Sequence, residues 1–166
     1  EKSSLARRSR KLFTLSAFHN ACADLIEGLA TGHLNRDADF VRDYWDAVAE
    51  HFPAWRQVLE NRLAASEVRE GYIHSHGIAL QALGHAGNAL LKQHLSDWRQ
   101  RLAGLQEIDW SRHNAQVWEG RVLIGGKVSK ATTNITLTTN VIKQALGLPL
   151  TEEQQRVENA YLRKDG

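Results

Sequence analysis

The sequence has no methionine, a single cysteine and only two prolines among its 166 residues. With Cys22 alone, no disulfide can form inside the chain, which is typical of a protein from a reducing compartment. The missing methionine and the start at Glu1 suggest a fragment of a larger protein, or a sequence that has lost residues. In the second case, some spacings between motif residues would be too short.

Long apolar runs are also missing. No stretch approaches the roughly 20 residues that a membrane-spanning helix requires, and the first residues lack the apolar core of a secretory signal. We therefore expect no membrane partner. The hydrophobic fraction of 42% and the charged fraction of 24% are those of an ordinary globular protein. This length and composition predict one helical domain over residues 1–166.

Most of the chain shows apolar residues at helical spacing. Ser9 is a candidate N-cap for the first helix, and Pro53 suits the first turn of the third. Thr151 and Gln154 form a capping-box pattern that opens the last one. We predict helices at about residues 12–29, 37–52, 53–63, 66–91, 96–105, 138–146 and 151–162.

One segment has no helical period. Gly125 and Gly126 lie between two β-branched stretches, which predicts a small hairpin or an ordered loop, and a Thr/Asn-rich stretch follows over 132–139. We treat 110–137 as an irregular insert. The predicted fold class is mostly α, a helical bundle of five to seven helices with one irregular loop or small hairpin near residues 118–134.

Charge is distributed unevenly, although the net charge is only +2. Residues 1–11 hold five basic side chains and one acid, and residues 120–150 hold four basic side chains and no acid. Residues 37–70 show the reverse, with eight acids and four bases. Two basic segments therefore flank an acidic middle, a pattern that permits contact with phosphate groups.

The basic segment late in the chain predicts a DNA contact. Its cations are interleaved with glycine and small polar donors, which is the residue chemistry that binds a nucleic-acid backbone. It does not have the residue order of a nucleotide-triphosphate loop. The alternative is a positive loop that only caps the bundle. The predicted DNA-binding residues are Arg121, Lys127, Ser129, Lys130 and Lys143.

The region from Lys143 into the last helix resembles a helix-turn-helix in outline. Glu152 and Glu153 open that last helix, however, and would repel phosphate where a recognition helix meets DNA.

Catalytic and metal motifs are not found. His74 and His76 are two residues apart, so on a helix they cannot both face one ion. No serine lies in a Gly-x-Ser-x-Gly turn, and no paired cysteine or histidine motif accompanies the histidines. We predict no catalytic residue, no cofactor, no metal, and a protein that is not an enzyme. Gly77, Gly84 and Gly87 predict close packing between helices.

Several blocks of the sequence form a distinctive set. They are Leu12–Ser16, Tyr72–Gly77 with Leu83–Gly84, Trp118–Arg121, Gly126–Lys130 and Ile142–Leu148. These blocks resemble the C-terminal region of the DndB family of DNA sulfur modification proteins, which belongs to the DGQHR-domain group. The likeness covers about residues 8–161, but the Asp-Gly-Gln-His-Arg motif of that group is absent.

The resemblance implies a bacterial regulator that binds the promoter of the modification genes and represses them, without transferring sulfur itself. It also implies a cytoplasmic, nucleoid-associated protein with double-stranded DNA as its partner.

Two alternatives stay open at this stage. The chain could be a helical scaffold that docks other proteins of the same system, or a second copy of itself, through the glycine face, Trp55 and Trp98. It could also be part of an enzyme completed by a missing N-terminal half, with His74 or His76 as an acid–base group.

Overall fold

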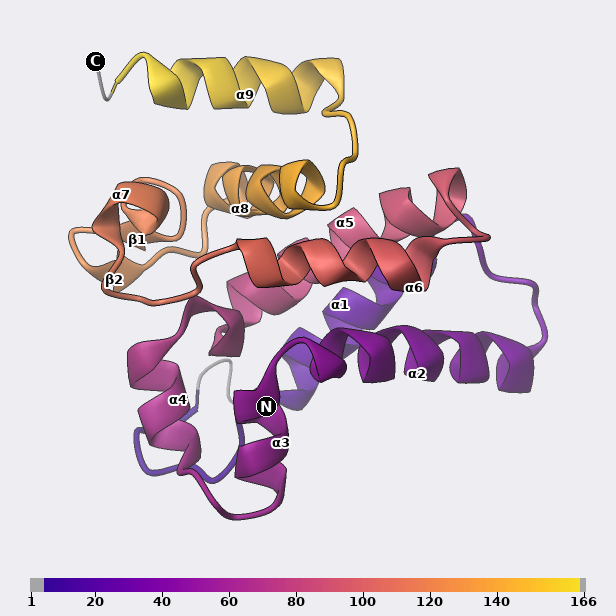
Figure 1. Cartoon of the computed structure of the whole chain (residues 1–166), viewed down its shortest axis with the longest axis horizontal. Coiled ribbons are helices and arrows are strands. Elements are labelled where there is room, and N and C mark those ends of the chain that lie inside the picture. Colours follow the sequence, from indigo (N-terminus) through magenta and orange to yellow (C-terminus); the bar gives the residue numbers. More distant parts are fainter. Residues whose placement is uncertain (1–4, 165–166) are drawn as a thin grey trace.

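Helix α5 (Gly77–Gln93) runs through the middle of the structure, and ten of its 17 residues are buried. The computed structural model describes residues 5–164. Helix α1 (Leu15–Ile26) packs against one side of α5, and helix α8 (Thr132–Ala145) packs against the other (Figure 1). These three helices form the centre of the fold.

Two further long helices complete the outer layers. Helix α2 (Leu34–Glu50) contacts α1, and helix α9 (Glu152–Leu162) lies on the outer side of α8 (Figure 1). Shorter elements connect these helices: α3 (Pro53–Leu59), α4 (Ala65–Gly71), the 3-10 helix η1 (Ile73–Ser75), α6 (Trp98–Arg101), the 3-10 helix η2 (Leu102–Glu107), α7 (Ala115–Trp118), and strands β1 (Leu123–Ile124) and β2 (Lys127–Val128).

The predicted fold class is confirmed. The structure is 65% helix, and residues 5–164 contain nine α-helices and one small antiparallel sheet. Seven of these α-helices have seven residues or more, which matches the five to seven expected. Gly125 and Gly126 form the predicted hairpin turn, and both have positive φ angles. In the described part of the chain, no helix combines the length and apolar composition needed to cross a bilayer.

Close packing through glycine is also confirmed at two positions of α5. A Cβ atom built on Gly84 would lie 2.5 Å from the backbone oxygen of Ala21, and one on Gly87 would collide with the Tyr44 hydroxyl. Tyr44 itself donates a hydrogen bond of 2.6 Å to the carbonyl oxygen of Leu83. The missing side chains therefore let α1 and α2 approach the central helix.

The first helix begins later than predicted. It starts at Leu15, where the Thr14 hydroxyl accepts a 3.1 Å hydrogen bond from the amide of Ala17. Residues 5–13 are not helical. A helix that began near Ser9 would place cationic side chains at the positive end of its dipole, which is unfavourable. Thr14 is therefore the N-cap, in place of Ser9.

The long helix predicted over 66–91 is broken into α4, η1 and α5. Tyr72 forms an isolated antiparallel bridge with Ser111, and the amide of Ile73 donates to the carbonyl oxygen of Trp110 at 2.9 Å. This pairing with a distant segment holds Tyr72 in an extended conformation, which a continuous helix would not allow. Gly77 is consequently the first residue of α5 and does not lie in the interior of a longer helix.

Helix α8 begins at Thr132, so the predicted insert over 110–137 is too long at its C-terminal end. The Thr/Asn-rich stretch can lie in a buried helix because its hydroxyls bond to carbonyl oxygens of the same helix. Thr138 donates to Asn134 at 2.7 Å, and Thr139 donates to Ile135 at 2.8 Å. These bonds satisfy polar groups that would otherwise be buried without partners.

Candidate nucleic-acid interface

The two basic segments of the sequence meet at one pocket of about 550 Å³. We call it the junction pocket. Its walls come from the N-terminal segment, from α1, from the turn between α4 and α5, and from the end of β2 with the start of α8. Positive charge from segments far apart in the sequence is therefore gathered in one place.

Four cationic side chains line the junction pocket, and Glu70 is the one carboxylate among its described lining residues. The cations are Arg7, Arg69, Arg112 and Lys130. Arg7 and Glu70 pair with each other at 3.3 Å, and both side chains are largely exposed. The other three cations form no ion pair within residues 5–164, so the pocket keeps a net positive charge.

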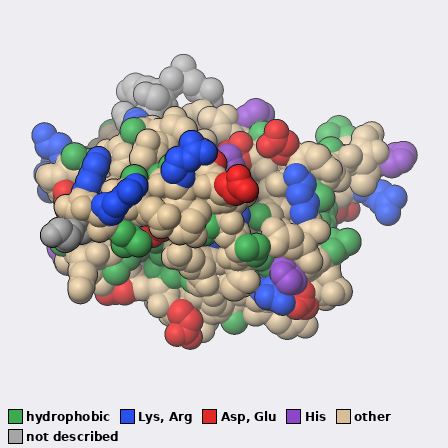
Figure 2. Space-filling view, turned by 90° about the horizontal axis from the view of Figure 1, so that it is seen from above, with side chains coloured by type: hydrophobic (Ala, Val, Ile, Leu, Met, Phe, Trp, Pro, Cys, Tyr) green, Lys and Arg blue, Asp and Glu red, His purple; other side chains and the backbone are tan. Residues whose placement is uncertain are grey.

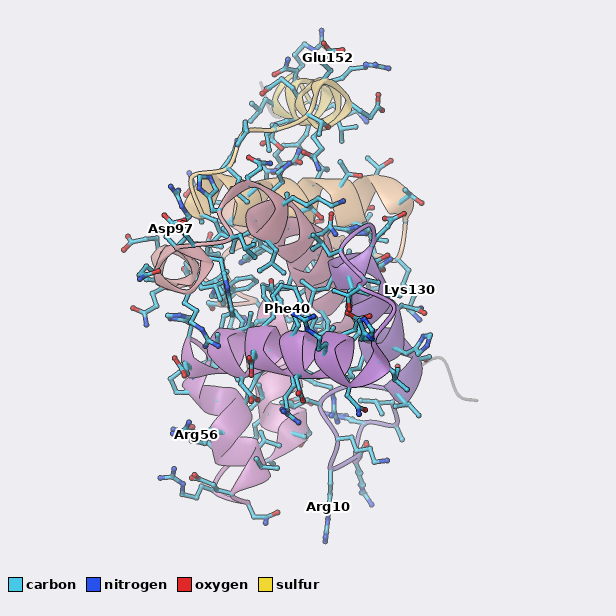
Figure 3. The ribbon with its side chains drawn as sticks, turned by 90° about the vertical axis from the view of Figure 1, so that its right-hand side faces the viewer. Arg10, Phe40, Arg56, Asp97, Lys130 and Glu152 are labelled. Carbon is cyan, nitrogen blue, oxygen red and sulfur yellow. The ribbon has the colours of Figure 1, made fainter. Side chains whose placement is uncertain are left out.

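Arg69 holds the N-terminal segment in place. Its guanidinium donates hydrogen bonds to the carbonyl oxygens of Arg7 at 3.0 Å and Ser9 at 3.1 Å, and also to that of Lys11. Carbonyl oxygens satisfy the donors of the guanidinium but do not cancel its charge. The segment that carries Arg8, Arg10 and Lys11 therefore stays close to the pocket, and in Figure 3 Arg10 projects from the body of the molecule.

Arg112 fixes the hairpin against α4. Its guanidinium donates to the carbonyl oxygen of Gly126 at 3.0 Å and to that of Arg69 at 3.4 Å. No local pattern in the sequence marks Arg69, which lies in the acidic middle, or Arg112, which lies in the irregular stretch. Only the meeting of distant segments identifies these two as site residues.

His76 lies on the wall of the junction pocket in its neutral form. Its Nε2 atom lies 2.8 Å from the carbonyl oxygen of Arg69 and acts as donor to it, which leaves Nδ1 as an acceptor. Burial, together with the positive charge of Arg112, lowers the pKa of His76 to about 4. The ring is therefore uncharged at neutral pH.

His74 points away from this site into an aromatic cluster. Its ring stacks on Phe52 at 4.6 Å and on Tyr72 at 4.9 Å between centroids, and its Nδ1 accepts a 3.1 Å hydrogen bond from the indole of Trp55. Burial, with a smaller effect of His76, lowers the pKa of His74 to about 4. The two histidines thus lie in different environments, His74 in the aromatic cluster and His76 on the pocket wall. Residues 5–164 contain no group of three or more potential metal ligands.

Three of the five residues predicted to bind DNA lie on this side of the molecule. Lys127, on β2, and Lys130, just after it, are exposed and form no ion pair within the described chain. Ser129 is half-buried on the pocket wall, and its hydroxyl donates to the Asn134 side chain at 2.7 Å. Lys130 and Ser129 line the pocket itself, whereas Lys127 belongs to the hairpin beside it.

Arg121 does not belong to an exposed phosphate site, contrary to the sequence prediction. The residue is 9% exposed, and its guanidinium forms a two-point ion pair with Glu158 of α9, at 2.5 and 2.9 Å. The guanidinium also lies over the ring of Tyr161, 4.2 Å from its centroid. This charge is already neutralised inside the fold, so Arg121 is not available to bind a phosphate.

Lys143 is likewise unavailable to DNA. The residue is 3% exposed, and its ammonium donates to the Gln154 side chain at 2.7 Å. Burial lowers the pKa of this lysine below its ordinary value. Figure 2 looks onto the face that α9 covers, and both basic and acidic side chains occur there. That face is therefore not a single positive surface, and the helix-turn-helix outline around Lys143 loses its support.

The glycine turn of the hairpin is occupied as well. The carboxylate of Glu119 accepts hydrogen bonds from the amides of Gly125, at 2.5 Å, and Gly126, at 3.3 Å. Free backbone amides at such a glycine turn could otherwise hold a phosphate group. Because the chain supplies its own anion here, the exposed groups that the hairpin offers to a phosphate are its lysines and not these backbone amides.

Comparison with known proteins identifies the family. Neither a curated protein nor a solved structure matches the chain. The family model DndB, described as DNA-sulfur modification-associated, matches residues 1–149. That range contains the junction pocket and the hairpin and ends just before α9. The chain therefore belongs to the DndB family of proteins associated with DNA sulfur modification.

Proposed function

We propose that this domain is a DNA-binding regulatory module of the DNA sulfur modification system, which represses transcription and has no catalytic role of its own. One observation carries the proposal. Arg69, Arg112 and Lys130 come from three separate parts of the chain and meet at the junction pocket, and none of them forms an ion pair with a carboxylate of residues 5–164. A surface of this kind attracts a polyanion, and the family connects the chain with DNA.

The exposed cations around the pocket would contact the phosphate backbone. Lys127 and Lys130 extend from the hairpin side, and Arg8, Arg10 and Lys11 extend from the N-terminal segment held by Arg69. Backbone contacts of this type position a protein on DNA without reading its sequence. Recognition of one promoter would therefore need further contacts to bases.

Charge reversal at the hairpin tests the proposal. In the double variant Lys127→Glu/Lys130→Glu, binding of the full chain to a promoter duplex should weaken, and the slope of log K against log salt should fall by about 1.8, or roughly 0.9 for each lost phosphate contact. A scrambled duplex of equal length should lose the same affinity, because these lysines would contact phosphates. Fluorescence anisotropy at several salt concentrations measures both quantities.

The matched control reverses two charges elsewhere. Arg36 and Arg56 are exposed, lie outside the junction pocket and form no ion pair with another described residue, so Arg36→Glu/Arg56→Glu gives the same change in net charge. Figure 3 shows Arg56 and Lys130 on opposite sides of the molecule. If both double variants lose affinity equally, net charge explains the binding and the interface is wrong. Absence of salt-dependent binding by the unaltered chain would also refute it.

The alternative of a protein-docking scaffold loses the surface first assigned to it. Gly84 and Gly87 are covered by α1 and α2, and Trp98 is buried at 8% exposure. Trp55 is half-buried, and its ring packs against Phe52 at 4.9 Å between centroids. These groups hold the fold together, so none of them forms an open docking face. The histidines of the enzyme alternative likewise have structural partners within the fold.

A further inference from the structure

The junction pocket offers more enclosed volume than contact with a DNA backbone requires. Phosphates of a duplex can be bound by side chains on an open surface, whereas this cavity has a volume of about 550 Å³, within the usual range of small-molecule sites. Its walls are partly apolar, with side chains from the N-terminal segment, α5, β2 and α8. These apolar lining residues include Phe13, Ile78, Val128 and Ile135.

Two side-chain amides in the cavity, that of the exposed Asn20 and that of the half-buried Gln81, have no hydrogen-bond partner among the described residues. Asn20 on α1 and Gln81 on α5 both line the pocket, and neither side chain forms a hydrogen bond with the described part of the chain. An amide can donate and accept at the same time, which matches the edge of a nucleobase. The neutral His76 adds an acceptor at Nδ1 on the same wall.

Groups suited to a phosphate lie in the same cavity. Arg112 and Lys130 keep their positive charges, as described above, and Gly77 and Ile78 begin the 17-residue helix α5 in the pocket wall. No side chain caps this end of α5. The first amides and the dipole of the helix therefore add to the field of the two cations.

We infer that the junction pocket binds a single nucleotide, with its base against the apolar wall and the two amides and its phosphate near Arg112, Lys130 and the start of α5. Apolar surface, base-edge partners and a cationic end occur together in a cavity of matching size. Such a ligand has two sources, a free nucleotide or one nucleotide turned out of a DNA strand. The first source goes beyond the proposed function, and the second rests on it.

Calorimetric titration of the full chain tests the site with three probes: deoxyadenosine monophosphate, deoxyadenosine and inorganic phosphate. The nucleotide should bind more tightly than either part alone, because only the nucleotide fills both ends of the pocket. Equal affinity for the nucleotide and inorganic phosphate would overturn the inference. The inference would also be overturned if the nucleotide does not bind in calorimetry and DNA does not bind in the duplex assay described below.

Two variants locate the ligand, and neither side chain has a hydrogen bond or ion pair within residues 5–164 to lose. Lys130→Gln and Gln81→Leu should each weaken nucleotide binding about tenfold, the loss expected when a hydrogen bond to a charged group or a buried polar contact is removed. Arg36→Gln, outside the pocket, is the control and should leave the affinity unchanged. Nucleotide binding that is insensitive to both pocket variants would place the ligand elsewhere and refute the assignment.

A duplex carrying 2-aminopurine separates the two sources. If the nucleotide comes from DNA, the fluorescence of the probe should rise on binding, and deoxyadenosine monophosphate should reverse the rise. If the source is a free nucleotide, the calorimetric signal is present and the fluorescence does not change. If the nucleotide binds but no duplex does, the nucleotide site is supported and the DNA interface is refuted. The two proposals can therefore fail separately.

Discussion

Replacing Glu158 with glutamine should lower the free energy of unfolding by about 3 kcal/mol, because it leaves Arg121 as a buried charge without its partner. The side chains of Glu158 and Arg121 are only 4% and 11% exposed. Loss of one member of such a pair costs roughly 3–5 kcal/mol. The ring of Tyr161 beneath the guanidinium offsets part of this, since a cation–π contact contributes about 1 kcal/mol.

The ionisation of Glu158 gives the same prediction a pH signature. Burial alone would raise the pKa of Glu158, but hydrogen bonds from Arg121 and Asn140 outweigh it and hold the pKa below its ordinary value. A lowered carboxyl pKa adds stability above the unfolded pKa of about 4.3, and that stability is lost as the pH falls through the folded value. The difference between the two proteins should therefore be constant near neutral pH and shrink in acid.

Urea unfolding followed by circular dichroism measures the effect, with Glu153→Gln as the matched control on the same helix. Glu153 pairs with Arg156 at 3.0 Å, but both side chains are exposed, so this variant should change stability by less than about 0.5 kcal/mol. The double variant Arg121→Met/Glu158→Leu should recover most of the loss, because it removes both charges. Equal stability of the two glutamine variants would refute the assignment of a buried ion pair.

Three further predictions concern the core and the pocket wall. Gly84→Ala should destabilise the protein by about 1–3 kcal/mol despite the better helix propensity of alanine, because the new Cβ would clash with the backbone of Ala21. Gly71→Ala is the control, because open space surrounds Gly71, and should not destabilise the protein. Urea unfolding compares the two variants. Between pH 6.5 and about 4, His74 takes up a proton in the unfolded chain but stays neutral in the folded chain because its pKa is lowered, so the folded protein loses stability as the pH falls. His74→Phe should therefore reduce this loss. The free energies of unfolding at pH 7 and pH 5 measure the effect. Arg69→Gln should speed tryptic cleavage within residues 5–11 relative to Arg62→Gln, because it removes the contacts to the carbonyl oxygens there; equal cleavage rates would contradict this role.

Local signals in the sequence predicted much of the fold. Pro53 begins a helix, Thr151 and Gln154 form a capping box, and Gly125 with Gly126 forms the hairpin turn, each as expected. All of these features depend on residues within four positions of one another. Backbone geometry and a nearby hydrogen bond are sufficient to determine such features.

Long-range contacts account for what the sequence did not predict. The bridge from Tyr72 to Ser111 breaks the predicted long helix, and the contact from Arg121 to Glu158 buries a cation that a local charge count treats as exposed. The periodic pattern and the charge count contain no information about a partner 37 or more residues away. The candidate site was therefore predicted in its general location, with Lys127 and Lys130, but not in its arginines.

The position of α9 outside the family-matched range has a practical consequence. A protein shortened to residues 1–149 would lose the carboxylate that covers Arg121 and accepts from Asn140. Such a shortened protein would carry an artificial anion site at Arg121, which lies between α7 and β1, and would bind nucleic acid, heparin or phosphocellulose through it. Affinities measured on that version would describe a surface that only the removal of α9 exposes. The boundary chosen for expression therefore decides which surface an experiment tests.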